Sequence, residues 1–470
     1  MDYKFDEKKF IESFNAKSIE VKSADSFRLT HKADNQFKLF PFKASGKTQS
    51  PIITDLEEVV SSFFREALKE QTEKIDYEEL CEDMLKEINI DKEDIEFFKD
   101  LIQSLFFVKD NFVANNFALY QYQSSENNKS VDNLAKFLFS IFGINENDRV
   151  YIEKVKEKYN YNVLEKLVIK TIEEKKVSDV DGKNFYFRVK IDVEEKFRKD
   201  FYFMLESGMT SLEDFSNLFS VYYFYYMSQT CIILDHFCSG KRNDEVKFYY
   251  ALDWEKVSRN RKCCEEGWGK LQGSISHMFS HAITLEILNQ TLDEEMYDYI
   301  AFGEEARSSN DKDMRMADEV KKAEEIYCSY VGDYKKFDNI KLQNGESKTD
   351  EAIKHLYKCV ETQFLETERK RANQFYNEKF SEFCKIRWVK NRKKSGLVLN
   401  LTERDIIFLT KICIRNLNKI RLNDLYKEYE YRGIYLDNTS KEYLQEFFTK
   451  LNLIDKKSDS GDAQYVKRIL

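Results

Sequence analysis

Three short patterns in the sequence contain residue types that form chemical sites in other proteins. The first is SGKT at Ser45–Thr48, which matches the end of a phosphate-binding loop, where backbone N–H groups and a lysine hold nucleotide phosphates. The loop needs a glycine where Pro41 stands, and Pro51 interferes with the helix that should follow. We therefore expect no nucleotide binding at this segment.

The second pattern is a pair of histidines, His277 and His281, in the segment SHMFSH. Residues four apart on a helix point the same way, as zinc ligands do, and Cys263 and Cys264 lie nearby in the sequence. No glutamate follows the first histidine, as it would in a metalloprotease, and the surrounding helical face resembles a protein core. We expect both histidines to be buried and hydrogen-bonded, and a metal site is the alternative.

The third pattern combines two acidic residues with a lysine, namely Asp181, Glu194 and Lys196, as in metal-dependent nucleases. Because 34% of the residues are charged, such triplets arise often by chance. Nothing else in the sequence offers a nucleophile with a base or a glycine-rich phosphate cradle. The sequence therefore predicts a protein that is not an enzyme, with no catalytic, cofactor-binding or metal-ligating residue and no cofactor.

Positive charge is concentrated at the C-terminal end. The formal net charge is −9, yet residues 369–470 have an excess of Lys and Arg, which leaves a strongly acidic remainder. The run KIRWVKNRKK predicts DNA contacts by Lys385, Arg387, Trp388, Lys390, Arg392, Lys393 and Lys394. Such a cluster binds phosphates strongly and in a salt-dependent manner. The alternative is a solvated helix end whose cations interact with the negative end of the helix dipole.

The composition predicts a mainly α-helical protein. The chain has 470 residues, 42% of them hydrophobic, which is ample for a sizeable core. Its two prolines lie near the start, so no proline interrupts a helix downstream. Nine cysteines without regular spacing, and an opening segment that is not apolar, predict free thiols in a cytoplasmic protein. Residues 215–237 are the most apolar segment, but polar residues interrupt them, so we expect a buried helix and no membrane span.

The N-terminal half is expected to form two units. Residues 1–125 combine a small extended cap, with Phe27, Leu29, Phe37 and Leu39 at strand-like spacing, and three amphipathic helices after residue 51. Residues 126–195 contain three helices and a β-hairpin with its turn at Asp181 and Gly182. The return strand is predicted to point Phe185, Phe187, Val189 and Ile191 inward and Tyr186, Arg188 and Lys190 outward. These are the ingredients of a winged helix, and the sequence leaves open whether this unit is one.

The central region, residues 196–368, is predicted to be an aromatic-rich helical core. Within it the segment NDKDMRMADEVKKAEE has no continuous apolar stripe and is expected to be a solvated helix. A long helix is predicted from Glu351 to about Lys394, and residues 369–396 are its basic end and a linker.

The C-terminal residues 397–470 are predicted to form a winged-helix domain. Thr402 and Asp405 have the spacing of a capping box at the start of a first helix. A short strand at residues 420–422, two further helices, and a hairpin with its turn at residues 458–462 follow. Helix, strand, helix, helix and hairpin is the winged-helix order.

The third helix of this domain is predicted to be a poor sequence reader. Its outward positions are Lys441, Glu442, Gln445, Glu446, Thr449 and Lys450. Two glutamates facing phosphates oppose binding, and no arginine is placed to contact guanine. The candidate DNA contacts of the domain are Lys441, Gln445, Lys450, Lys456, Lys457, Lys467 and Arg468. Docking to another protein is an equally weighted role for the same module.

Three segments resemble a known family. They are FYFMLESGMTSLEDFSNLFSVYYFYYMSQ, YYALDWEKVSRNRKCCEEGWGKLQGSISHMFSHAITLEILNQ and the tail NLIDKKSDSGDAQYV. Together they are similar to the G component of the DNA phosphorothioation-dependent restriction system, the DptG or DndG family. The resemblance implies a bacterial anti-phage defence protein that acts with an ATPase and a larger translocase against DNA lacking sulfur in its backbone. No catalytic residues are carried over from it.

The leading functional hypothesis is therefore a non-catalytic subunit of a restriction complex. Its acidic helical body is expected to bind the ATPase and translocase components, and its basic C-terminal third to contact the backbone of double-stranded DNA. A winged-helix DNA-binding regulator is the alternative, followed by a cryptic nuclease. A regulator is normally shorter and basic in its reading helix, which favours the first hypothesis.

Overall fold

The computed structural model describes residues 3–16, 29–43, 52–71, 74–123, 129–174, 177–178, 186–292, 295–456 and 464–469. Within these residues the protein is mainly helical, as its composition predicts. Several expected features lie outside the described residues, namely Phe27, Ser45–Thr48, Asp181, Gly182, Phe185, Lys457 and the turn at 458–462.

The N-terminal part consists of helices and two-residue strands. Its elements are α1 (Glu7–Ser13), α2 (Glu57–Leu68), β1 (Glu70–Gln71), α3 (Tyr77–Glu87), α4 (Ile95–Phe106), β2 (Phe107–Val108), β3 (Asn111–Phe112) and the 3-10 helix η1 (Phe117–Tyr122). The three amphipathic helices predicted after residue 51 are confirmed as α2, α3 and α4. The strands expected around Leu29, Phe37 and Leu39 are wrong. These side chains are buried, but backbone N–H groups of residues 35–37 and 39–40 donate to the Glu286 and Asp34 carboxylates in place of a strand partner.

The predicted hairpin of residues 126–195 is also wrong. Three helices form as expected, α5 (Lys129–Ile141), α6 (Glu146–Lys158) and α7 (Val163–Glu173), but the short strand β4 (Val177–Ser178) pairs antiparallel with β1. Residues 186–191 are described and form no strand. Lys190, expected to point outward, is buried with its Nζ 3.1 Å from the Asp244 carbonyl oxygen, and Ile191, expected inward, is 46% exposed. The backbone N–H groups of Tyr186, Phe187 and Val189 donate to the Ser140 hydroxyl, the Lys38 carbonyl oxygen and the Tyr226 hydroxyl in place of a strand partner.

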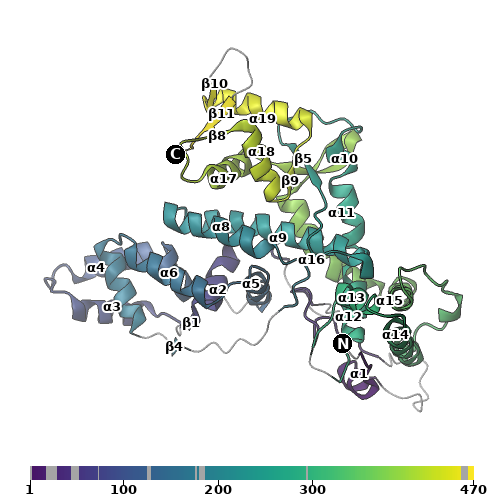
Figure 1. Ribbon diagram of the computed structural model, residues 1–470. Helices are drawn as coiled ribbons and strands as arrows, with labels where there is room; N and C mark the ends of the chain where they lie inside the picture. The colour runs from purple at the N-terminus through teal and green to yellow at the C-terminus, as the bar shows by residue number, and fades with distance from the viewer. Residues whose placement is uncertain are drawn as a thin grey trace.

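The central region contains most of the long helices. All the elements of this region are α8 (Val193–Ser207), α9 (Leu212–Asp235), η2 (Phe237–Ser239), β5 (Phe248–Leu252), α10 (Lys262–Glu265), α11 (Trp268–Ile275), α12 (Met278–Leu288), α13 (Tyr299–Ala306), α14 (Asn310–Tyr330), η3 (Phe337–Asn339) and α15 (Lys348–Glu366). Helix α9 is buried on all its faces, which confirms the buried helix expected at 215–237. Figure 1 shows α8 and α9 between the N-terminal helices and the C-terminal elements. Among the described residues, no helix is long and apolar enough to cross a membrane.

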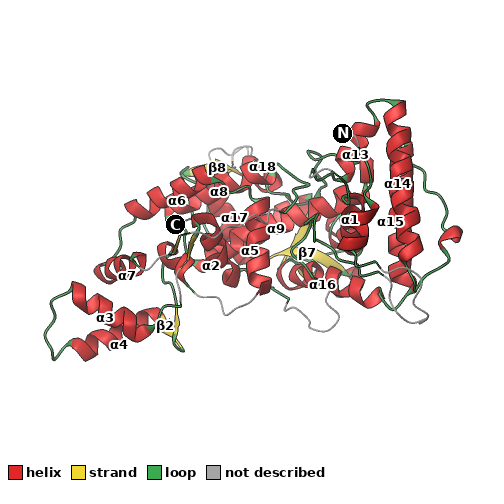
Figure 2. Ribbon diagram, turned by 90° about the horizontal axis from the view of Figure 1, so that it is seen from below, coloured by secondary structure: helices red, strands yellow, loops and turns green. Residues whose placement is uncertain are grey.

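Helix α14 differs from the sequence expectation in its burial. Helix α14 was expected to be solvated, yet Met316, Val320, Ala323 and Tyr327 form a buried stripe along it. Figure 2 shows α14 beside α15 at one end of the molecule, with α3 and α4 at the opposite end.

The single long helix predicted from Glu351 to Lys394 is wrong, because it is two helices, α15 and α16 (Lys370–Arg387). Helix α15 ends at Glu366, and the backbone of the next residue, Thr367, is extended. The Thr367 hydroxyl donates to the Gln363 carbonyl oxygen at 2.7 Å and accepts from the Arg369 N–H at 3.3 Å. A local side-chain hydrogen bond therefore ends the helix without glycine or proline.

The C-terminal region contains the elements in the predicted order. After β6 (Val389–Asn391) and η4 (Lys393–Ser395) come β7 (Leu397–Leu401), α17 (Glu403–Ile414), β8 (Lys419–Arg421), α18 (Leu422–Tyr431), β9 (Ile434–Tyr435), α19 (Asn438–Lys450), β10 (Ile454–Lys456) and β11 (Gln464–Lys467). The capping box of Thr402 and Asp405 is confirmed. Strands β10, β11 and β8 form an antiparallel sheet in that order, with Val466 opposite both Ile454 and Ile420.

A second sheet joins the C-terminal region to the central core. Its strand order is β6, β7, β5, β9, and β5 is parallel to both β7 and β9. The central strand β5 comes from residues 248–252, some 145 positions before β7. The sheet therefore crosses the boundary expected at residue 397, and residues 389–391 are a strand of it, where a linker was expected.

Candidate nucleic-acid interface

The C-terminal elements are fixed to the central helices by a buried ion pair. The guanidinium of Arg432, at the end of α18, donates to both carboxylate oxygens of Asp200 on α8, at 2.7 and 2.6 Å. Both side chains are 0% exposed, and the Tyr222 hydroxyl donates to the same carboxylate at 2.7 Å. A two-point pair of this kind fixes orientation as well as distance. Any surface formed by α18, α19 and their sheet is therefore held in one position on the body.

The first turn of α19 is occupied by contacts within the chain. Asp437 caps this helix, and the Arg261 side chain donates to Asp437 Oδ2 at 3.0 Å and to the Ser440 hydroxyl at 2.7 Å. Glu255 lies 2.9 Å from the same guanidinium. A DNA-reading helix contacts base edges with its N-terminal residues. Here Asp437 and Ser440 in that turn already have partners on the central core.

The outward face of α19 has the charge pattern that the sequence predicts. All six positions expected to point outward are exposed or half-buried, including Glu442 and Glu446. The Lys441 ammonium lies 3.3 Å from a carboxylate oxygen of Glu430 and over the Tyr426 ring. Lys450 is exposed in the last turn. The two glutamates oppose phosphate binding on this face.

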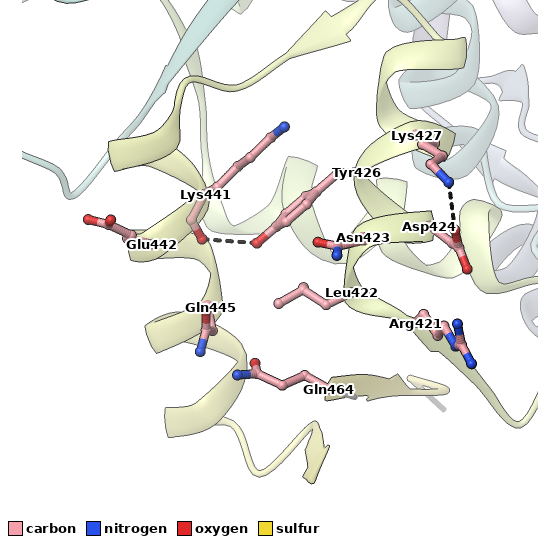
Figure 3. A pocket seen from close by; sticks show the side chains of 10 residues that line it. All are labelled: Arg421, Leu422, Asn423, Asp424, Tyr426, Lys427, Lys441, Glu442, Gln445 and Gln464. Carbon is pink, nitrogen blue, oxygen red and sulfur yellow. Dashed lines mark hydrogen bonds and ion pairs between the residues drawn. The ribbon is translucent and has the colours of Figure 1, made fainter. Parts of the chain in front are cut away.

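A cavity of about 450 Å³ lies between the start of α18, helix α19 and β11 (Figure 3). It is lined by Arg421, Leu422, Asn423, Asp424, Tyr426, Lys427, Lys441, Glu442, Gln445 and Gln464. The Lys427 ammonium is 3.1 Å from the Asp424 carboxylate, and the Tyr426 hydroxyl donates to the Lys441 carbonyl oxygen at 3.0 Å. Three cations and two carboxylates nearly balance, so the cavity suits polar recognition more than the binding of an isolated anion.

The outer face of the β10–β11–β8 sheet is the most basic part of this region. Its central residues are Lys419, Arg421, Tyr465 and Lys467, which we call the basic sheet face. Tyr465 is opposite Arg421 and Lys467 is opposite Lys419, so the four side chains share one side of the sheet, while Ile420 and Val466 point into the core. The Arg421 Nε donates to the Tyr465 hydroxyl at 3.3 Å, and the Lys419 ammonium is 5.0 Å from the centre of the Tyr465 ring.

One carboxylate lies on the same side as the basic sheet face. Asp455 is opposite Tyr465 and pairs with Lys419 at 2.5 Å. The Lys467 side chain is exposed and donates to the Asn452 carbonyl oxygen at 3.4 Å, and exposed Arg468 follows it. Lys456 lies in β10. Among the described residues the face thus carries three cations, Lys419, Arg421 and Lys467, against Asp455, an arrangement suited to phosphate groups.

Sequence reasoning missed Lys419, Arg421 and Tyr465. The alternation of K-I-R and Q-Y-V-K places them on the side opposite the buried Ile420 and Val466. That signal becomes readable only when the two strands are known to pair, because their separation in sequence is more than forty residues.

The basic run at residues 385–394 mostly holds the core together. Trp388, expected to contact DNA, is 1% exposed and packs against Phe224 and Tyr250, so this expectation is corrected. Arg387 pairs with Asp405 at 2.5 Å, and Lys385 pairs with Glu382 at 2.6 Å. The apolar indole is buried because the chain turns from α16 into β6 at this residue.

The second half of the run fastens β5 to its neighbours. Arg392 donates to the carbonyl oxygens of Leu252 at 2.6 Å and Asp253 at 3.0 Å, and to Asn400 at 2.8 Å, while Lys390 pairs with Asp253. Lys393 and Lys394 are exposed, and in the part of the chain that the structure describes their ammonium groups make no ion pair. Phosphate contact by the run remains a prediction chiefly for these two lysines.

The two histidines converge on one carboxylate of α9. Asp235 Oδ1 lies 2.8 Å from His277 Nδ1 and 3.0 Å from His281 Nε2. His281 is 1% exposed, which confirms its predicted burial, but the His277 side chain is 38% exposed, which corrects the expectation for that residue. Cys263 lies apart, in a small apolar cluster with Ala251 and Val398.

The pKa values around Asp235 follow from these contacts. Hydrogen bonding to Asp235 raises the pKa of His277, whereas burial lowers the pKa of His281. Burial favours the neutral form of Asp235, but hydrogen bonds from His277 and His281 outweigh it and hold the pKa of the carboxyl below its usual range. The three side chains have the types and spacing of a metal site.

Two residues of the suggested nuclease triplet, Glu194 and Lys196, have other partners, whereas Asp181 lies outside the described residues. Glu194 pairs with Arg188. The buried Lys196 ammonium lies 2.6 Å from the Tyr225 hydroxyl, 3.1 Å from Asp192 and 3.2 Å from Glu245. A lysine held in this way is not directed toward a scissile phosphate.

Comparison with known proteins identified no relative: no family model matches this chain, and no curated protein matches it. The structural features that bear on function are the basic sheet face, the cavity beside it and the contacts that hold the first turn of α19.

Proposed function

We propose that this protein is a non-catalytic subunit of a bacterial phosphorothioation-dependent DNA restriction complex, and that it contacts the backbone of double-stranded DNA through the basic sheet face. The observation that carries the DNA part is the placement of Lys419, Arg421 and Lys467 around Tyr465 on one side of a sheet. The family resemblance of the central and C-terminal segments supports the restriction-complex part.

The C-terminal region is proposed to be a winged-helix domain. The order α17, β8, α18, α19, β10, β11 is that of winged helices, with the additional two-residue strand β9 between α18 and α19, and β11 lies between β10 and β8 in the sheet. In this assignment β10 and β11 form the wing and α19 is the third helix.

Contact with the backbone is favoured over reading of bases. Arg261 and Glu255 hold the first turn of α19, and Glu442 and Glu446 point outward from it. Lysines and arginines on a sheet face bind phosphates without regard to sequence. These features favour an adaptor over the alternative of a sequence-specific regulator.

An adaptor also needs surfaces for its ATPase and translocase partners. Helix α4 exposes Phe97 by 71% and Leu105 by 44%, with half-buried Leu101 between them at helical spacing. Exposed apolar stripes of this kind are typical of protein-binding surfaces. We therefore assign α4 to partner binding within the proposed complex.

The DNA proposal is tested with a fluorescent duplex titrated over a series of salt concentrations. The variant K419Q/R421Q/K467Q should bind about tenfold more weakly at low salt, and its plot of log affinity against log salt should be shallower by as much as about 0.9 per lost phosphate contact. Changing the duplex sequence should leave the affinity of the wild-type protein unchanged.

The matched control is K335Q/K336Q/K341Q, which removes three exposed cations near η3. Its salt dependence should equal that of the wild-type protein. Equal slopes for both triple variants, or no binding by the wild-type protein at low salt, would refute the DNA proposal. Failure of the neighbouring gene products to co-purify with the chain would refute its membership of the complex.

A further inference from the structure

Helices α14 and α15 bring four metal-ligand side chains together. Glu324 and Cys328 lie one turn apart on α14, and His355 and Cys359 lie one turn apart on α15. His355 Nδ1 is 2.8 Å from Glu324 Oε2 and 4.0 Å from Cys359 Sγ. The ligand atoms of Glu324, His355 and Cys359 all lie within 4.8 Å of one another. The Cys328 thiol is close enough to Cys359 to raise the pKa of that thiol, so the two side chains are neighbours.

This cluster is largely removed from solvent. The Glu324 and His355 side chains are 18% and 14% exposed, Cys359 is buried and Cys328 is half-buried. Carboxylates and imidazoles in such positions are costly unless each polar atom has a suitable partner.

The contacts of His355 orient its ring toward the cluster. Nε2 lies 3.3 Å from the Ile340 carbonyl oxygen, and Nδ1 faces the Glu324 carboxylate. A neutral imidazole has a single N–H and one lone pair in the plane of the ring. If Nε2–H donates to Ile340, the lone pair of Nδ1 points at Glu324 and Cys359, which is the orientation of a metal-binding imidazole.

The cluster around Asp235 has a different set of ligand atoms. Asp235 Oδ1 lies 2.8 Å from His277 Nδ1 and 3.0 Å from His281 Nε2, and His277 Nε2 lies 3.9 Å from the Glu361 carboxylate. The remaining nitrogen of His281 lies 3.2 Å from the Tyr299 hydroxyl. The three side chains of that cluster include no sulfur, whereas the cluster on α14 and α15 contains a cysteine, a ligand type that favours zinc.

We propose that Glu324, Cys328, His355 and Cys359 bind one zinc ion that links α14 to α15. Two sulfurs, one imidazole nitrogen and one carboxylate oxygen form a complete tetrahedral set for zinc. With zinc–ligand bonds of about 2.0 to 2.3 Å, a nitrogen and a sulfur ligand lie about 3.6 Å apart, close to the 4.0 Å that separates His355 Nδ1 from Cys359 Sγ. The set is filled by the protein alone, so the site is structural.

The surroundings fit this assignment. The hydrogen bond from His355 to the Ile340 carbonyl oxygen fixes the tautomer that presents Nδ1 to the metal, as such outer contacts do in zinc proteins. Ile340 belongs to the connection between the two helices, directly after η3. Zinc binding displaces the protons of the two thiols and involves no oxidation. The ion therefore ties together α14, α15 and their connection.

The test is the metal content of the full-length protein, purified under reducing conditions without chelator and measured by plasma mass spectrometry after exposure to zinc sulfate and desalting. Wild-type protein should contain close to one zinc ion per chain. The variant C328S/C359S should lose it almost completely. C264S changes another half-buried cysteine, and H277Q changes the Asp235 cluster; both should keep the zinc.

Cobalt loading of the wild-type protein gives a second measurement that needs no variant to fold. A site with two cysteines produces the intense near-ultraviolet charge-transfer absorption of cobalt thiolates, together with the visible bands of tetrahedral cobalt. Because the Asp235 cluster contains no sulfur, binding there lacks the charge-transfer band.

The proposal is overturned if wild-type protein binds no zinc, if C328S/C359S keeps it, or if H277Q alone loses it. A peptide map that finds Cys328 joined to Cys359 by a disulfide in protein purified without reductant also overturns it.

Discussion

Arg432 and Asp200 are 232 positions apart in the sequence, yet they form a two-point ion pair in which neither side chain is exposed. Arg415 and Tyr222 add further hydrogen bonds to the same carboxylate, at 3.1 and 2.7 Å. This contact determines how the C-terminal elements lie on α8 and α9.

Removing the negative charge of this pair should destabilise the protein strongly. In Asp200→Asn the buried Arg432 guanidinium loses its two-point partner and keeps only the partly exposed Glu428 carboxylate at 2.8 Å among its described ion pairs, so the free energy of unfolding should fall by as much as about 3 to 5 kcal/mol. Urea unfolding followed by circular dichroism measures the change. Asp455→Asn, which breaks a half-exposed pair with Lys419, should cost less than about 1 kcal/mol. Similar losses of unfolding free energy for both variants would show that the buried pair stabilises the protein no more than the half-exposed pair does.

Gly433 should tolerate no side chain, because both its backbone and its surroundings oppose one. Its φ is +76°, and an added Cβ would overlap the Tyr225 ring of α9. Gly208, which ends α8, has the same φ of +76° but open space around it. Gly208→Ala should therefore cost about 1 to 2 kcal/mol from backbone strain alone, and Gly433→Ala about 1 to 3 kcal/mol more from overpacking. Thermal unfolding of the two variants compares them, and equal melting temperatures would contradict the close contact with Tyr225.

Asp34 should make the protein less stable as the pH rises. Burial raises the pKa of this carboxyl from 3.8 to about 7, although hydrogen bonds from Tyr376, Phe40 and Leu39 act in the opposite direction. Because the folded-state pKa lies above the unfolded value, the stabilisation is complete below pH 3.8 and is lost as the pH approaches 7. Urea unfolding of Asp34→Asn at several pH values should show a shallower decline than in the wild-type protein. An unchanged slope in Asp34→Asn would refute the prediction.

The exposed face of α4 should be needed for partner binding and not for folding. Phe97→Ser/Leu105→Ser changes two exposed side chains, so the melting temperature should stay close to that of the wild-type protein, while co-purification of the ATPase and translocase components should be lost. Val163→Ser/Leu342→Ser alters two apolar residues elsewhere that are even more exposed, and this variant should co-purify normally. Normal co-purification of the α4 variant would remove this helix from the proposed interface.

Local features were predictable from the sequence because neighbouring residues determine them. The apolar spacing of α2, α3 and α4 and the capping box of Thr402 and Asp405 are contained within a few turns of chain. The order of the C-terminal elements and the outward face of α19 follow from the same periodicity.

Long-range pairing was decided only by the tertiary structure. Strand β4 pairs with β1, and β5 inserts between β7 and β9, because backbone groups far apart in sequence meet there. The basic run is a further case. The Arg392 guanidinium and the Trp388 ring are both suited to contacts with DNA, but Arg392 donates to a carbonyl oxygen of β5 and Trp388 is buried in the core. The type of a residue limits the interactions that it can make, whereas the packing of the folded chain determines which partner it contacts.

The two candidate sites show the same division. Residue types and their spacing were enough to predict that the chain is mainly helical, that its C-terminal end is basic, and that this end contains a helix, a strand, two helices and two further strands in that order. The tertiary structure placed Arg421 beside Tyr465 and brought Glu324 and Cys328 against His355 and Cys359. Each grouping joins residues from separate elements, and no local pattern specifies the distance between elements that fold onto one another.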